Sequence, residues 1–79
     1  NPFAWYQLGV VYSHKGDTPR AQLATAESAL LQRNYPTAIR SSQIAMGGIE
    51  EHTPDWIRAQ DISLIAKSEF ERTGGRRRR

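Results

Sequence analysis

The chain has 79 residues, and a polypeptide this short buries only about 60% of the surface that its unfolded form exposes. It contains no cysteine, which excludes a disulfide framework and a thiolate zinc site. The formal net charge is +3, but removing the four arginines at 76–79 leaves −1 for the rest of the chain. A nucleic-acid-binding domain spreads its basic residues over one face of the fold, so this distribution argues against that class.

The first residues, Asn1-Pro2-Phe3, include no initiator methionine. Neither a signal sequence nor a long apolar run of the kind that spans a membrane follows them. We therefore expect the chain to be a piece of a longer protein.

Four prolines mark regularly spaced helix starts. They stand 17, 17 and 18 residues apart, at Pro2, Pro19, Pro36 and Pro54. Proline is tolerated in the first turn of a helix, where its missing N–H would have no partner. Three of the prolines directly follow a residue suited to an N-cap, and the fourth lies two residues after one; these cap residues are Asn1, Thr18, Thr53 and Asn34.

Glycines stand where the same helices should end. Gly16 precedes the second start, Gly47-Gly48 precedes the fourth, and Gly74-Gly75 lies near the terminus, where a left-handed C-cap favours glycine. Together these signals predict one helical domain over residues 1–73 and a flexible Gly-Gly-Arg tail over 74–79. The predicted helices span about 2–15, 18–33, 35–47 and 54–73.

Apolar residues recur at the helical period in every predicted helix. In the first helix Trp5, Leu8 and Tyr12 form this stripe, and we expect them in the core. The stripes of the other three helices are Leu23, Ala26 and Leu30, then Ala38, Ile39, Ser42, Ala45 and Met46, then Trp56, Ala59, Ile62, Ala66 and Phe70. No segment alternates like a strand, so the predicted fold class is all-α, built from antiparallel helix hairpins.

Two such helices repeat over about 34 residues, which is the tetratricopeptide period. The string Trp5-x2-Leu8-Gly9-x2-Tyr12 matches the first helix of that repeat, where Gly9 would let the neighbouring helix approach closely. Further matches are Gly16-Asp17 at the turn, Ala21 at the start of the second helix and, half a repeat later, Ala26, Ala29, Tyr35, Ala38 and Ala45. Departures fall at Thr25 and Ser28. We predict about two tetratricopeptide-type repeats in a short right-handed superhelical array.

A longer set of residues resembles a narrower family. It comprises Asn1-Pro2-Phe3-Ala4-Trp5, Gly16-Asp17, Ala24-x-Ala26-Glu27-x-Ala29-Leu30-Leu31, Tyr35-x2-Ala38-Ile39 and Trp56-x-Arg58-Ala59-Gln60-Asp61-Ile62. This set is similar to the C-terminal tetratricopeptide (TPR) region of bacterial, especially alphaproteobacterial, zinc metallopeptidases related to HtpX and the CAAX-prenyl proteases. The last string is the most specific, because generic repeats do not require it in a terminal helix.

The resemblance implies a parent zinc metalloendopeptidase whose HExxH motif lies in an N-terminal catalytic domain. Such a protease would be periplasmic or envelope-associated and would act in the quality control of envelope proteins. This region would then dock on the catalytic domain or present clients to it.

The sequence itself contains no recognisable catalytic or metal motif. Neither His14 nor His52 begins HExxH, which needs two histidines one helical turn apart. Ser41-Ser42 and Glu50-Glu51 lack the partners that nucleophilic or acid–base chemistry requires. We expect this fragment to be non-catalytic and to hold no metal or cofactor, with zinc confined to the parent's catalytic domain.

One row of residues is the candidate partner-binding surface. Tyr6, Val10 and His14 are spaced i, i+4 and i+8, on the face of the first helix that lines the concave side of a tetratricopeptide array. We expect Arg20 and Glu27 of the second helix to extend this row. The alternative reading is an ordinary solvated helix surface.

Three functions remain open. The first is a module for protein–protein interaction or domain docking, which binds a protein, a peptide or the parent's own catalytic domain, and which includes the accessory role in a protease. The second is a free-standing TPR adaptor. The third, binding of nucleic acid or a membrane surface through the arginine run, would require strongly salt-dependent binding, and we expect neither nucleic acid nor membrane insertion.

Overall fold

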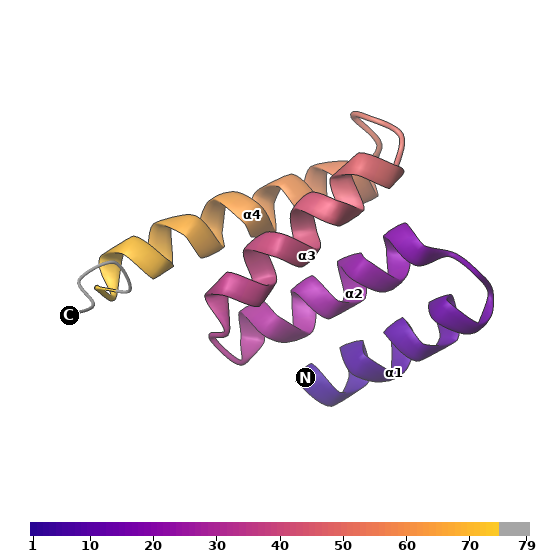
Figure 1. Ribbon diagram of the computed structural model, residues 1–79, viewed down its shortest axis with the longest axis horizontal. Coiled ribbons are helices and arrows are strands. Elements are labelled where there is room, and N and C mark those ends of the chain that lie inside the picture. The colour runs from indigo at the N-terminus through magenta and orange to yellow at the C-terminus, as the bar shows by residue number, and fades with distance from the viewer. Residues whose placement is uncertain (75–79) are drawn as a thin grey trace.

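A computed structural model describes residues 1–74, and this part of the chain folds into four helices (Figure 1). The helices are α1 (Pro2–His14), α2 (Thr18–Leu31), α3 (Tyr35–Gly48) and α4 (Pro54–Arg72). Successive helices pack against one another as antiparallel hairpins, and the described residues contain no strand, so the predicted all-α class is confirmed. Each predicted boundary lies within two residues of the observed one. The predicted tail lies outside the described residues, except for Gly74.

All four helices begin with a proline in the first turn and a capping side chain, as predicted. The cap of α2 is Asp17, however, and the prediction that Thr18 caps it was wrong. Asp17 Oδ1 accepts a hydrogen bond from the Arg20 amide at 3.1 Å, which leaves Thr18 as the first helical residue. Asn34 has almost the same backbone angles as Asp17, so α2 and α3 start alike, with a cap, one residue and then proline.

The two loops that flank α2 also share one conformation. The amide of Asp17 bonds to the carbonyl of Tyr12 at 2.9 Å, and the amide of Asn34 bonds to the carbonyl of Ala29 at 2.8 Å. The residue before each cap is left-handed, with φ of 77° at Gly16 and 62° at Arg33. This geometry satisfies orphan carbonyls at the helix end. Gly16 therefore has the left-handed C-cap role that the sequence predicted, and an arginine occupies the equivalent position one helix later.

Gly47 and Gly48 do not end α3 in the predicted way. Both are helical, neither has a positive φ, and Ile49 caps the helix in an extended conformation. A β carbon at Gly48 would overlap the ring of Pro19, whereas one at Gly47 would meet open space. Gly48 is therefore required by a close approach of α3 to the start of α2 and not by a turn.

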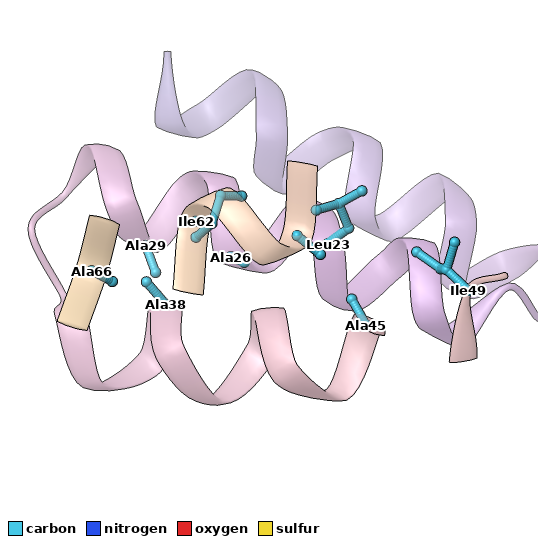
Figure 2. Packing of buried hydrophobic residues seen from close by; sticks show 9 residues of the cluster. Leu23, Ala26, Ala29, Ala38, Ala45, Ile49, Ile62 and Ala66 are labelled. Atoms are coloured by element: carbon cyan, nitrogen blue, oxygen red, sulfur yellow. The ribbon is translucent and has the colours of Figure 1, made fainter. Parts of the chain in front are cut away.

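Helix α2 lies at the centre of the array. It packs against α1 and α3 and also contacts α4, whereas α1 contacts only α2 among the described helices (Figure 1). The core between α2, α3 and α4 consists mainly of alanines around the fully buried Ile62 (Figure 2). Its buried members are Leu23, Ala26, Ala29, Ala38, Ala45, Ile49, Ala59, Ile62 and Ala66. Small side chains let the helix axes approach closely. Trp56, on the predicted apolar stripe of α4, is only partly buried and packs against this cluster.

The expectation that Trp5, Leu8 and Tyr12 belong to the core was wrong. No residue of α1 is buried, and Leu8 is still 36% exposed. The reason lies at Gly9, where a β carbon would stand 3.5 Å from that of Ala24. Because α1 meets α2 through this glycine, its large side chains project to either side of the contact.

Candidate partner-binding surfaces

The first surface is a cleft of about 320 Å³ between α1, α2 and α4, here called the Trp5 cleft. Its floor is one face of α2, formed by four residues at the helical spacing i, i+3, i+4 and i+7. The lining residues are Trp5, Leu8 and Tyr12 from α1, Arg20, Leu23, Ala24 and Glu27 from α2, and Asp55 and Arg58 from α4. The wall on α1 is thus aromatic and aliphatic, and the wall on α4 is charged.

A two-pronged ion pair joins α2 to α4 inside this cleft. Nε of Arg58 donates to Oε2 of Glu27 at 2.7 Å, and Nη2 donates to Oε1 at 2.8 Å. The Glu27 side chain is only 9% exposed, whereas that of Arg58 is 43% exposed. The hydrogen bond to Glu27, with charge attraction from Glu27 and Asp61, raises the pKa of Arg58. A buried carboxylate needs such a partner, so this pair helps to fix the distance between the two helices.

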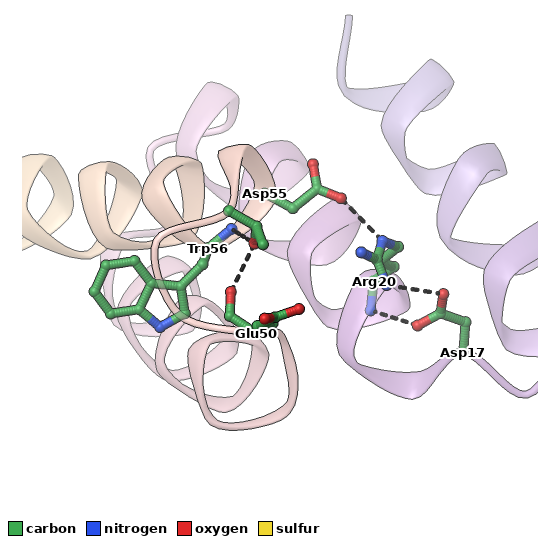
Figure 3. Close-up of polar contacts among 6 residues, drawn as sticks. Asp17, Arg20, Glu50, Asp55 and Trp56 are labelled. Carbon is green, nitrogen blue, oxygen red and sulfur yellow. Dashed lines mark hydrogen bonds and ion pairs between the residues drawn. The ribbon is translucent and has the colours of Figure 1, made fainter.

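A second arginine bridges the same two helices closer to the loops (Figure 3). Nε of Arg20 donates to Oδ2 of Asp55 at 2.9 Å, and Nη1 approaches Oδ2 of Asp17 at 3.4 Å. The hydrogen bond to Asp55 is the main cause that raises the pKa of Arg20. Asp17 thus caps α2 through one oxygen and faces Arg20 through the other.

The second surface lies on the other side of the α1–α2 hairpin and is here called the Tyr6 groove. It measures about 370 Å³ and is lined by Tyr6, Val10 and His14 together with neutral polar side chains of α2, α3 and the loop between them. These polar residues include Gln22, Thr25, Ser28, Gln32, Asn34 and Thr37. No Asp, Glu, Lys or Arg lines this groove within the described part of the chain.

The structure therefore separates the five predicted site residues. Tyr6, Val10 and His14 lie together in the Tyr6 groove, whereas Arg20 and Glu27 lie in the Trp5 cleft. The prediction that Arg20 and Glu27 extend the row of Tyr6 was wrong, because Gly9 faces α2 and the two stripes of α1 diverge from it. A role of any of the five in partner binding stays a prediction.

Five residues that line the Trp5 cleft were not predicted as site residues: Trp5, Leu8 and Tyr12, which were expected in the core, and Asp55 and Arg58. One available signal was the composition of α1, because residues 2–13 contain no charged side chain and are apolar on every face. A helix that packs on one neighbour cannot bury all of its faces. Nothing in the sequence indicated the partners of Arg20 and Glu27, which lie 35 and 31 residues further along the chain.

Residues 1–74 contain no group of three or more His, Cys, Asp or Glu side chains arranged to hold a metal ion. Among them, no helix has the length and apolar character needed to cross a membrane. His52, with φ of 69° in the α3–α4 loop, stacks at a tilt on Trp56, with 5.1 Å between the ring centroids.

Comparison with known proteins identifies no relative, because no protein-family model, curated protein or solved structure matches this chain.

Proposed function

We propose that this chain is a non-catalytic helical-repeat module for protein–protein interaction, and that it binds its partner through the Trp5 cleft. The observation that carries the proposal is the composition of the cleft, where Trp5 and Tyr12 of α1 line the same hollow as Arg20 of α2 and Arg58 of α4. Tryptophan, tyrosine and arginine are the residue types that contribute most to the binding energy of protein interfaces. Here they surround a hollow and do not fill a core.

The exposure of α1 supports the same proposal. Phe3 is 65% exposed and Val11 is 47% exposed, and no residue of the helix is buried. A helix that is apolar on all sides is normally covered by other protein, because contiguous exposed apolar surface is costly in water. A partner that occupies the cleft would cover the Trp5 side of α1 and reduce this cost.

The resemblance of residues 56–62 to the tail of zinc metallopeptidases supports one setting for the module. In that setting it is the accessory region of an envelope protease, and its partner is the catalytic domain or a client protein. The coding sequence upstream of Asn1 tests this setting. An HExxH motif there would support the protease, and its absence would favour a free-standing adaptor.

Selection of random peptides on the immobilised chain tests the interaction function. We expect enriched peptides to bind the Leu8→Ser variant at least about tenfold more weakly, a loss of about 1.4 kcal/mol. Val11→Ser is the matched control, because it makes the same kind of change on α1 at a residue that does not line the cleft. Thermal melts of both variants show whether they stay folded.

Two results would contradict the proposal. One is a selection that enriches no peptide, and the other is equal binding of the enriched peptides to folded Leu8→Ser and Val11→Ser. Enriched peptides that depend on Tyr6 and Val10 instead would place the binding surface in the Tyr6 groove.

A further inference from the structure

We infer that the partner segment in the Trp5 cleft is a basic amphipathic helix. Its apolar side chains would pack against the α1 wall, and its lysine or arginine side chains would face the carboxylates of α2 and α4. This inference rests on the proposed function and specifies the chemistry of the partner.

The charge around the cleft indicates a cationic partner. Each of the two arginines is already flanked by two carboxylates: Arg20 by Asp17 and Asp55, and Arg58 by Glu27 and Asp61. Four carboxylates against two guanidinium groups leave two negative charges in excess at neutral pH. An acidic partner would compete with these carboxylates for the arginines and would be repelled, whereas a basic partner reduces the excess.

Two carboxylates are positioned to receive a partner cation. The Asp55 side chain is 46% exposed, and only its Oδ2 accepts a hydrogen bond from Arg20. Asp61 does not line the cleft itself, but it stands one turn after Arg58 on α4, is exposed, and acts through its charge on Arg58. Both can therefore accept charge-assisted hydrogen bonds from a partner without loss of the pairs that join α2 to α4.

The shape of the cleft indicates a helical partner. The floor on α2 follows the line of a helix face, and the walls on α1 and α4 do not contact each other. One wall presents Trp5, Leu8 and Tyr12, and the other presents Asp55 and Arg58. A segment that lies along this trough needs an apolar side and a charged side, which is the pattern of an amphipathic helix bound in a groove.

Calorimetric titration with two designed peptides tests the inference. The first peptide places leucine on one face of a helix and lysine on the other, and the second replaces every lysine by glutamate. We expect the lysine peptide to bind, and we expect its affinity to fall as salt is added. The glutamate peptide should not bind. Asp61→Asn should lower the affinity for the lysine peptide by about threefold, which is the effect expected from the loss of one exposed charge pair.

Glu51→Gln is the control, because it removes the same charge from an exposed loop residue that does not line the cleft and does not act on Arg20 or Arg58, whereas Asp61 acts on Arg58. Equal effects of the two variants, tighter binding of the glutamate peptide, or no binding of either peptide would overturn the inference. The proposed function would survive each of these results, since the peptide selection detects binding of any charge. If that selection enriched no peptide, both the proposed function and this inference would be contradicted.

Discussion

Gly48 in the last turn of α3 faces the ring of Pro19 in the first turn of α2, with no room for a side chain between them. The contact sets how closely the end of α3 approaches the start of α2. It also gives neighbouring glycines opposite roles, because Gly47 faces open space within the same helix.

We therefore expect opposite effects from one substitution at these two positions. Gly48→Ala should lower the free energy of unfolding, because overpacking typically costs about 1–3 kcal/mol. Gly47→Ala should raise it by about 0.5–1 kcal/mol, since alanine favours a helix and meets no neighbour. Urea unfolding of both variants measures the difference. Equal effects at the two positions would show that the Pro19 contact is not tight.

The pair between Glu27 and Arg58 should show a strong energetic coupling. Arg58→Met leaves the buried carboxylate of Glu27 without its partner, and we expect a loss of about 1–3 kcal/mol, less than for a fully buried pair because Arg58 is partly exposed. In the Arg58→Met variant, the additional change Glu27→Met should restore most of the lost free energy of unfolding, because it removes the unpaired charge. A double-mutant cycle in urea measures the coupling, and simple additivity would contradict it.

The left-handed residues of the two loops around α2 offer a reciprocal test. Arg33→Gly should raise the free energy of unfolding by about 0.5–1 kcal/mol, because glycine adopts positive φ without steric cost. Gly16→Arg should lower it by a similar amount, although space surrounds that position. Thermal melts of the two variants should therefore shift in opposite directions, and a common direction would exclude the backbone conformation as the cause.

Core and cleft residues should differ in their contribution to stability. Ile62→Ala removes a fully buried side chain and should cost about 2–5 kcal/mol. Trp5→Ala should cost about 1–2 kcal/mol, well below the value for a fully buried tryptophan, because Trp5 is only half-buried on α1. If Trp5→Ala proves the more damaging change, α1 is packed more tightly than the structure shows.

Glu69, near the end of α4, has a carboxyl group with a lowered pKa. The hydrogen bond from Arg72 is the main cause that lowers the pKa of Glu69. A lowered pKa means that this contact stabilises the helix end at neutral pH and loses its effect as acid protonates Glu69. Carboxyl NMR titration should show the low pKa, and Arg72→Gln should return it toward the ordinary value of a glutamate. An unchanged pKa in that variant would exclude Arg72 as the cause.

The helices could be predicted from sequence because their starts are local. A cap and a proline act within one turn, so the positions of all four starts follow from neighbouring residues alone. The same locality explains the error at Thr18, since Asp17 and Thr18 both suit an N-cap and only the backbone decides between them. Gly48 shows the opposite case, because its role depends on Pro19, far away in the sequence.

The candidate binding surfaces were harder to predict because α1 is apolar on every face. Periodicity finds the stripes of Trp5 and Tyr6 in such a helix but cannot say which one faces a neighbour. Gly9 matched the repeat pattern, and the structure does place it against α2. The pairs of Arg20 with Asp55 and of Glu27 with Arg58 depend on α4, whose position follows from its packing against α2 and α3 and not from any local signal.

The attachment of α1 to α2 alone makes it the least restrained helix of the described array. In an array that is held by neighbour contacts, a helix with a single neighbour can open without unfolding the rest. The amide protons of α1 would then exchange with solvent through this local opening, whereas those of α2 would exchange only when a larger part of the array unfolds. The Trp5 wall of the cleft belongs to that opening unit. Occupation of the cleft and closure of α1 are therefore thermodynamically linked, and each favours the other.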